Sequence, residues 1–212
     1  QAYKGVIGFD KSIYEATLAT EGQVIIDSSK QFITAAFHSN CGGFTANSQD
    51  VWLTSKPYLV KVEDKYCTST RNASWEVTVT LKNWKMFLQT KGVDTTQITD
   101  IKLYNYKPVG RPVFYPILNK KIPMIQFRNH FGLRSALFSV QVRKGDVRIV
   151  GHGYGHGVGL CQEGAMHMAS IGWKYDKIIN FYYKGVKIVN ITEVAPAAPI
   201  IDADIEKADT AK

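Results

Sequence analysis

The sequence lacks the features that mark membrane-spanning and nucleic-acid-binding proteins. No apolar run approaches the ~18 residues that a membrane-spanning helix needs. No basic stretch alternates with aromatic residues as in a groove for single-stranded nucleic acid. We therefore expect no transmembrane segment and no nucleic-acid partner. The chain also starts at Gln1 without a methionine or a basic-then-apolar leader, so we expect an N-terminal truncation, with any targeting signal upstream of Gln1.

Cysteine is scarce, because the chain contains only Cys41, Cys67 and Cys161. Three cysteines are too few for the disulfide-dense scaffolds of small secreted proteins. One pair and one free thiol is the simplest arrangement, and it does not fix the redox compartment.

Acidic residues are scarce in most of the chain. The formal net charge is +8, and residues 1–192 contain 24 basic against 13 acidic residues. Such a body attracts polyanions, including the acidic polymers of a cell wall, although a solvated basic surface explains the same charge. The hydrophobic fraction of 45% and the charged fraction of 21% are typical of a globular protein.

Short strands and a few short helices are predicted along residues 1–192, followed by a flexible acidic tail rich in alanine and proline over residues 193–212. The pattern favours a single α+β domain with mostly antiparallel strands. A hairpin is expected within 22–37, strands over 75–81, 98–106 and 186–191, and a second hairpin over 136–150. Helices are expected over 83–92 (capped by Asn83), 124–131, 162–171 and 175–183.

The most unusual stretch is GHGYGHGVGLCQEGA, residues 151–165, in which every second residue from 151 to 159 is glycine. A phosphate cradle would need the Lys-Ser/Thr of a P-loop, which is absent. His152 and His156 would need a helix to converge on a metal, and Cys161 would need a histidine as its base to act as a nucleophile. A packed turn whose imidazoles bond backbone carbonyls explains the stretch equally well.

A second stretch, HSNCGGFTANSQDVW at residues 38–52, places short polar groups and a glycine pair at the end of an apolar strand. Such a position is where a rigid scaffold presents binding groups, although an ordinary glycine turn has the same composition.

Together these stretches resemble the stage II sporulation protein D and amidase-enhancer family. The first resembles its Gly-His-Gly-x-Gly-Met-Ser-Gln-x-Gly-Ala segment, and the second its His-Ser-x-x-Gly-Gly-x-Thr segment. Residues 57–59 (PYL), 127–138 (FRNHFGLRSALF) and 175–185 (YDKIINFYYKG) also resemble family segments, in family order. The resemblance runs from about His38 to Ile191.

The resemblance implies an extracytoplasmic cell-envelope protein that acts on peptidoglycan glycan strands as a lytic transglycosylase. Such an enzyme cleaves between N-acetylmuramic acid and N-acetylglucosamine to leave 1,6-anhydro products. Its single catalytic glutamate sits in an N-terminal segment of the family that we expect upstream of Gln1, so this chain alone would be inactive. Glu163 occupies a variable family position and is not expected to be the acid.

Three alternatives are kept beside this prediction: a non-catalytic peptidoglycan-binding module, an activator of a cell-wall amidase, and a metal-dependent hydrolase using His38, His152 or His156 with a cysteine. No cofactor is expected to be required, although zinc is a candidate, since some family members bind zinc near the segment matched by His38. The ligand candidates are His38, Cys41 and Cys67, and a Cys41–Cys67 disulfide is an equal alternative. The residues expected to contact substrate are His38, Ser39, Asn40, Tyr58, His156 and Gln162.

Overall fold

The structure, a computed structural model, describes residues 10–52, 54–143 and 145–194. Most of the predicted tail, residues 195–212, lies outside the described residues, as does the start of the chain before residue 10. The described chain divides into two compact units, one built from residues 10–34 and 186–194 and the other from residues 35–185. Each is described by itself, and the predicted domain boundary after residue 192 stays a prediction.

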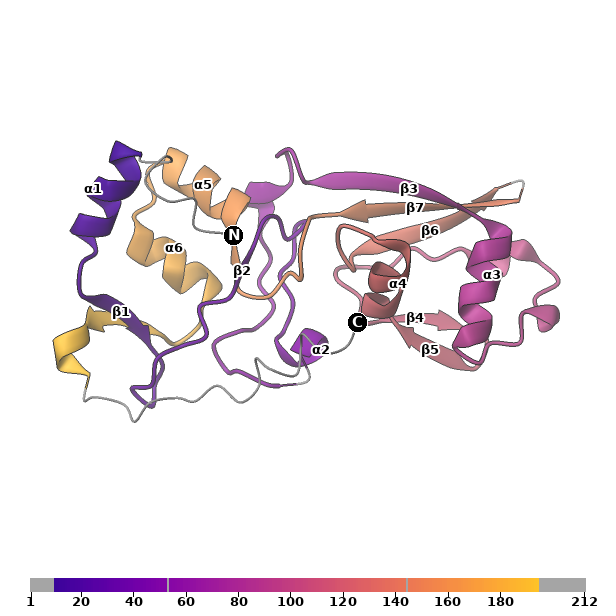
Figure 1. Ribbon diagram of the computed structural model, residues 1–212, viewed down its shortest axis with the longest axis horizontal. Helices are drawn as coiled ribbons and strands as arrows, with labels where there is room; N and C mark the ends of the chain where they lie inside the picture. Colours follow the sequence, from indigo (N-terminus) through magenta and orange to yellow (C-terminus); the bar gives the residue numbers. More distant parts are fainter. Residues whose placement is uncertain (1–9, 53, 144, 195–212) are drawn as a thin grey trace. The chain divides into compact units, whose positions relative to one another are not determined.

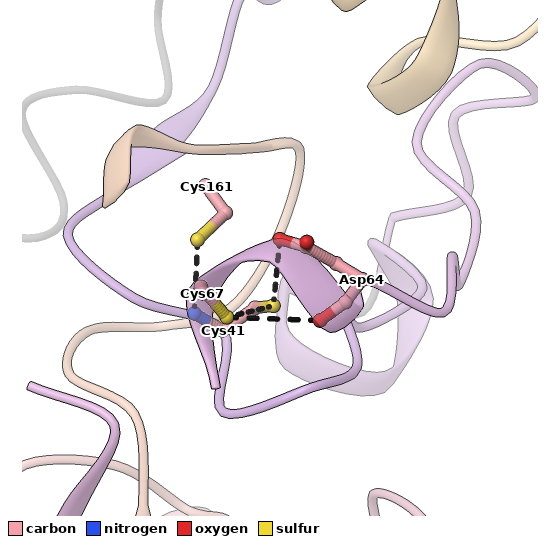
Figure 2. Close-up of side chains that lie close together, drawn as sticks. All are labelled: Cys41, Asp64, Cys67 and Cys161. Atoms are coloured by element: carbon pink, nitrogen blue, oxygen red, sulfur yellow. Dashed lines mark hydrogen bonds between the residues drawn. The ribbon is translucent and has the colours of Figure 1, made fainter. Parts of the chain in front are cut away.

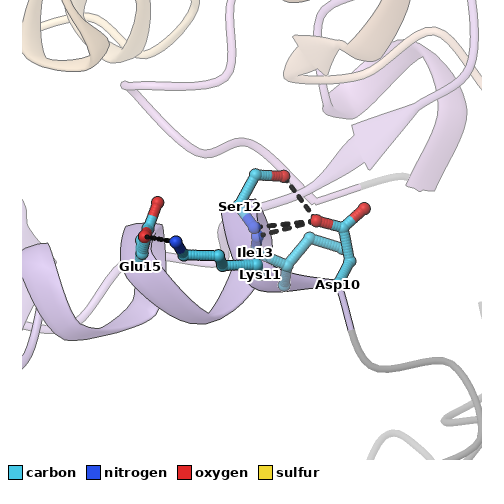
Figure 3. Close-up of polar contacts among 5 residues, drawn as sticks. All are labelled: Asp10, Lys11, Ser12, Ile13 and Glu15. Carbon is cyan, nitrogen blue, oxygen red and sulfur yellow. Dashed lines mark hydrogen bonds and ion pairs between the residues drawn. The ribbon is translucent and has the colours of Figure 1, made fainter.

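In the first unit, α1 (Lys11–Ala19) is followed by β1 (Gln23–Ile26), which pairs antiparallel with β9 (Lys187–Asn190). The side chain of Asp10 begins α1 by accepting a 2.8 Å hydrogen bond from the backbone N–H of Ser12 (Figure 3). After β9, a single 3₁₀ turn, η5 (Ile191–Glu193), ends the described chain.

The hairpin predicted within residues 22–37 is largely wrong. A turn does form, because the Asp27 side chain accepts hydrogen bonds from the N–H groups of Ser29 and Gln31. Only the single bridge between Ile26 and Phe32 follows it, and the main partner of β1 is β9. The β-rich composition marked the strand but could not identify its partner.

The second unit has its main hydrophobic core on a three-stranded antiparallel sheet in the order β3-β7-β6 (Figure 1). These strands are β3 (Ser74–Thr80), β7 (Asp146–His152) and β6 (Phe138–Arg143), close to their predicted positions. Strand residues pack in this core with the apolar faces of α3 (Leu81–Thr90) and α4 (Met124–Phe131). The buried aromatic residues of the core are Trp75, Trp84, Phe87, Tyr104, Tyr115, Phe127 and Phe138.

Two local predictions in this unit are wrong. The residues expected to form a strand over 98–106 contain the 3₁₀ helix η4 (Ile101–Tyr104), because the Asp100 side chain caps it at the N–H of Lys102. Helix α3 is capped by Thr80, whereas Asn83 was expected. A short hairpin of β4 (Phe114–Ile117) and β5 (Lys120–Pro123) was not predicted.

The remaining elements of the second unit surround the glycine-rich segments. Strand β2 (Phe37–His38) pairs in parallel with β8 (Leu160–Cys161), which leads directly into α5 (Gln162–Ser170). Helix α2 (Gln49–Trp52), the 3₁₀ turn η2 (Lys65–Cys67) and α6 (Tyr175–Tyr182) complete the unit. The predicted α+β class with mostly antiparallel strands is confirmed. In the described chain, no helix is long and apolar enough to cross a membrane.

Glycine is required where β8 meets the chain before β2. Gly159 has a φ of +72°, and a Cβ atom built on it would lie 2.1 Å from the carbonyl oxygen of Ala36. Gly132 has a similar φ of +61°, but its Cβ would meet nothing within 4 Å. The two positions therefore separate backbone strain from a steric clash.

We expect Gly159→Ala to lower the free energy of unfolding by more than about 3 kcal/mol, because the clash adds to the left-handed strain. Gly132→Ala, the matched control, should cost only about 1 kcal/mol. Urea denaturation of both variants measures the difference. Equal losses would mean that the two segments are not as close as the structure has them.

Candidate functional site

The two glycine-rich segments lie side by side. Besides the β2–β8 pair, Asn40 and Tyr154 exchange backbone hydrogen bonds of 3.1 and 2.8 Å. The N–H of Ala46 donates to the carbonyl of Gly157 at 2.7 Å. These contacts join residues more than 100 positions apart, and they bring together side chains from both segments.

His38 is buried, with 4% of its surface exposed. Its Nδ1 lies 3.1 Å from the carbonyl oxygen of Val158. Because a carbonyl only accepts, Nδ1 carries the proton and Nε2 is left as an acceptor. Nε2 is buried without a partner in the described chain. Burial, followed by the charge of His156, lowers the pKa of His38 to about 3, so its imidazole is neutral at pH 7.

His156 is partly exposed and lies against His38, with 5.5 Å between the ring centroids. Its Nδ1 accepts a 3.0 Å hydrogen bond from the N–H of Val158, so this nitrogen is unprotonated. The indole of Trp52 also lies against the His156 ring, with 5.3 Å between the ring centroids. Burial lowers the pKa of His156; a hydrogen bond with the backbone of Phe37 acts to raise it, and the charges of Arg128 and Arg111 act to lower it.

Glu163, at the start of α5, is held by side chains from the other segments. Its carboxylate accepts hydrogen bonds from the Asn40 amide at 2.8 Å and from the side chains of Thr70 and Asn72. Burial acts to raise its pKa, but these hydrogen bonds outweigh burial and lower it. Glu163 is therefore ionised at neutral pH.

Four buried side chains form a cluster, defined here as the sulfur–carboxylate cluster: Cys41, Asp64, Cys67 and Cys161 (Figure 2). Their ligand atoms all lie within 4.8 Å of one another. Cys41 Sγ lies 3.3 Å from Cys67 Sγ and 3.3 Å from Asp64 Oδ2. The carboxylate of Asp64 also accepts a 2.8 Å hydrogen bond from the Tyr182 hydroxyl, which fixes its orientation.

The cluster favours one thiolate. Hydrogen bonds from Cys161 and Cys41 lower the pKa of Cys67, whereas hydrogen bonds with Cys161 and Cys67 raise that of Cys41. Burial and the charge of Cys67 raise the pKa of Asp64. Four sulfur and oxygen donors with Tyr182 behind them are the donor set of a tetrahedral zinc site. Zn–S bonds of ~2.3 Å in such a site place neighbouring sulfurs ~3.8 Å apart. The ligand atoms of the cluster all lie within 4.8 Å of one another, close enough to share one ion. The residues present therefore fit zinc.

The predicted ligand set is only partly reproduced. Cys41 and Cys67 belong to the cluster, but His38 does not, and Asp64 and Cys161 take its place. The three cysteines are free, so the alternative Cys41–Cys67 disulfide is not formed in this structure. The metal-capable group found in the described chain contains no histidine, which gives no support to a hydrolase built on His38, His152 or His156.

The residues predicted to contact substrate differ in exposure. Asn40 and Tyr58 are buried like His38. The Asn40 amide donates hydrogen bonds to Cys67, Thr70 and Glu163. The partly exposed ones are Ser39, His156 and Gln162. Buried side chains shape the loops, whereas the partly exposed ones can meet a ligand; the substrate contacts themselves stay predictions.

The sequence did not predict the positions that three residues take in the site: Trp52, Asp64 and Cys161. Trp52 is 38% exposed beside His156. It stands at the end of the second family-like segment, so its position carried a signal. Asp64 lies in a connecting stretch with no motif of its own, and only the fold brings it to the cysteines.

No protein-family model matches the chain. Curated proteins do match. Stage II sporulation protein D of Bacillus amyloliquefaciens is 33% identical over 84% of this chain and 51% of its own length. The protein of the same name from Bacillus subtilis is 31% identical over 84% of this chain and 51% of its own length. Over most of its length the chain is similar to proteins named stage II sporulation protein D.

A third relative connects the chain to the second name in the predicted resemblance. The amidase enhancer of Bacillus subtilis is 25% identical over 90% of this chain and 34% of its own length. The resemblance to stage II sporulation protein D and the amidase enhancer is thus confirmed over most of the chain. The chain spans about half the length of the stage II sporulation protein D relatives and 34% of the length of the amidase enhancer.

The depressed pKa of His38 predicts a pH-dependent stability. The unfolded chain binds a proton on this histidine below about pH 6.5, whereas the folded chain does so only near pH 3. The unfolded state therefore gains protons first as the pH falls, and stability is lost between about pH 6.5 and 3. From pH 7 to pH 5, His38 should account for a loss of about 2 kcal/mol.

Urea unfolding at pH 7 and pH 5 measures this loss. His38→Gln should reduce the difference between the two pH values by about 2 kcal/mol. The control His167→Gln, at an exposed position, should keep the wild-type difference. An unchanged pH dependence in His38→Gln would contradict a neutral, buried His38.

Proposed function

We propose that the chain binds peptidoglycan glycan strands as part of a cell-envelope protein located outside the cytoplasm. The observation that carries this proposal is the convergence of the two glycine-rich segments, which places Trp52 beside His156. The names of the homologues support a role at the cell wall. The activity, substrate and partners of the whole protein are part of the proposal.

The exposed side chains of the site suit a sugar ligand. Sugars present apolar C–H faces that stack on aromatic rings and hydroxyl or N-acetyl groups that exchange hydrogen bonds. The Trp52 indole offers the aromatic face, and the neutral imidazole of His156 lies next to it. Ser39 and Gln162, both partly exposed, add hydrogen-bonding groups close by in sequence to β2 and β8.

The reaction proposed for the whole protein is lytic cleavage between N-acetylmuramic acid and N-acetylglucosamine to 1,6-anhydro products. This reaction needs a carboxylic acid that is protonated near neutral pH. Glu163 is ionised, and Asp64, whose pKa is raised, is fully buried in the sulfur–carboxylate cluster. We therefore assign neither of them as the acid, and propose that this chain holds the glycan strand.

Retention on insoluble peptidoglycan tests the binding proposal. We expect Trp52→Ala to weaken binding about fivefold to tenfold, because an aromatic contact is worth about 1 kcal/mol. The matched control is Phe114→Ala, since Phe114 is an exposed aromatic residue on β4 in the same unit. Retention of Trp52→Ala equal to that of wild type would remove Trp52 from the binding surface.

Product analysis tests the assignment of the acid. Incubated with purified sacculi, this chain should be retained without releasing 1,6-anhydro-muramyl products. A Glu163→Gln variant should be retained equally well. Release of anhydro products by the chain, abolished in Glu163→Gln, would show that Glu163 is the acid after all.

A second candidate function is activation of a cell-wall amidase, which the name of one homologue favours. In that case the chain would raise the release of stem peptides from sacculi by an added amidase. Addition of the chain to an amidase assay separates this function from glycan cleavage, because the two reactions break different bonds.

We also propose that the sulfur–carboxylate cluster holds one structural zinc ion. Four buried donors leave no position open for a substrate, and such closed sites contribute to folding. Zinc would link the glycine-rich segment 38–52, through Cys41, to the segment 151–165, through Cys161. The competing state is a Cys41–Cys67 disulfide, for which the two sulfurs would have to move together from 3.3 Å.

Elemental analysis of the purified chain should give about one zinc per molecule, and chelation should lower its melting temperature. Asp64→Asn should lower the zinc content, whereas the adjacent exposed Glu63→Gln should not. Metal-free protein that shows a Cys41–Cys67 disulfide by mass spectrometry without reductant would rule out the zinc site.

A further inference from the structure

A small cavity lies beside His156 and is lined by three basic side chains. Lys61, Arg111 and Arg128 reach it, and Asp50 is the acidic side chain in its lining. The cavity volume is about 40 Å³. A water molecule needs about 10–15 Å³ in this measure, so the space fits a group of three or four heavy atoms and excludes a sugar ring.

Arg111 is a cation held in place without a carboxylate partner. Its Nε donates to the carbonyl of Phe44 and its Nη2 to that of Cys41, both at 2.9 Å. These two bonds leave three of the five guanidinium N–H groups unused. In the described chain, no carboxylate lies within ion-pair distance of it. Burial lowers the pKa of Arg111 to about 10, which still leaves it charged at pH 7.

The other charges of the lining are not neutralised by one another. Arg128, on α4, is partly buried, and Lys61 is exposed with its Nζ 5.0 Å from the centroid of the Phe44 ring. The carboxylate of Asp50 accepts a 2.8 Å hydrogen bond from Asn47 and forms no ion pair with these cations. Three cations therefore face one carboxylate around a space that an anion would fill.

The partly buried positions of Arg111 and Arg128 make an anionic ligand favourable. A guanidinium taken out of water without a counter-ion is costly, and an oxyanion that accepts two of its N–H groups offsets that cost. Arg111 is anchored by backbone carbonyls, so little side-chain entropy is lost when it binds such a group.

We propose that this cavity binds one small oxyanion, a carboxylate or a phosphate, carried by the ligand that lies against Trp52 and His156. The inference rests on the proposed glycan-binding function. N-Acetylmuramic acid and N-acetylglucosamine alternate in the glycan strand and differ only in a lactyl ether, whose carboxylate is free wherever the stem peptide has been removed. The cavity would thus set the register of the strand by recognising the muramyl residue. A phosphate of an acidic wall polymer is the other source of this chemistry.

Titration with two sugars that differ only in the lactyl group, and with glycerol phosphate as a phosphate probe, tests the proposal. N-Acetylmuramic acid, N-acetylglucosamine and glycerol phosphate are each added to the chain, and binding is followed by the NMR shifts of the Trp52 indole and the His156 ring. We expect N-acetylmuramic acid to bind at least tenfold more tightly than N-acetylglucosamine, with a difference that shrinks as salt is added.

The variants Arg128→Gln and Lys61→Gln should remove most of that preference. Two variants are used because Arg128 is partly buried whereas Lys61 is exposed, so a folding defect in the first does not decide the result. Arg143→Gln is the matched control: it removes the same charge from the exposed end of β6, outside the cavity lining, and should keep the preference.

Equal binding of the two sugars, with no binding of glycerol phosphate, would overturn the anion site. A preference that survives in both Arg128→Gln and Lys61→Gln would overturn it too. Glycerol phosphate binding that depends on these residues, without a preference between the sugars, would support the site and assign it to phosphate. Retention on sacculi is measured in parallel, so a failed anion site with intact retention leaves the glycan-binding proposal standing. Lost retention with intact anion binding refutes only the glycan proposal.

Discussion

The parallel pairing of β2 with β8 is the constraint on which the rest of the site depends. Three contacts cross between the segments: the His38 ring lies against the His156 ring, the Asn40 amide donates to Glu163, and the backbone N–H of Cys41 donates to Cys161 Sγ. A two-residue strand pair supplies few hydrogen bonds. The pairing therefore depends on the close backbone approach that the glycines permit and on the polar and sulfur contacts that cross between the segments.

Hydrogen bonds within the second unit satisfy most of the buried polar atoms around the two segments. The Asn40 amide donates hydrogen bonds to three acceptors, and the Asp64 carboxylate accepts a hydrogen bond from the Tyr182 hydroxyl. Groups already bonded in this way gain little by turning to a ligand. The interior of the paired segments thus holds the segments together, and the proposed ligand binding is left to the partly exposed rim that Trp52 and His156 form. Nε2 of His38 is the exception, as a buried acceptor without a partner in the described chain.

Hydrophobic periodicity and the positions of helix-ending and turn residues predicted many of the helices and strands. Helix α4 ends at Gly132 in the left-handed conformation, as the sequence indicates, and the hairpin of β6 and β7 follows its alternating residues. The strand predicted over 98–106 was wrong, because capping by Asp100 favours a 3₁₀ helix there despite the β-rich composition. Of the candidate site, the two motifs indicated the two segments that the structure places side by side. They could not predict which side chains are buried, nor that Asp64 joins the cysteines, because both depend on contacts between distant residues.

Electrostatics divides the rim into a neutral and a charged part. Burial and the charges of Arg128 and Arg111 both disfavour a proton on His156, so its ring remains an uncharged hydrogen-bonding group at pH 7. The two guanidiniums keep their charge, and Arg111 is fixed by carbonyl groups of the glycine-rich segment 38–52. A protonated His156 would add a further cation next to them and would compete for the same anion. Because it stays neutral, the proposed glycan ligand would make its contacts through uncharged sugar groups at one set of residues and through its acidic substituent at another, so that both kinds of sugar in an alternating strand would be recognised.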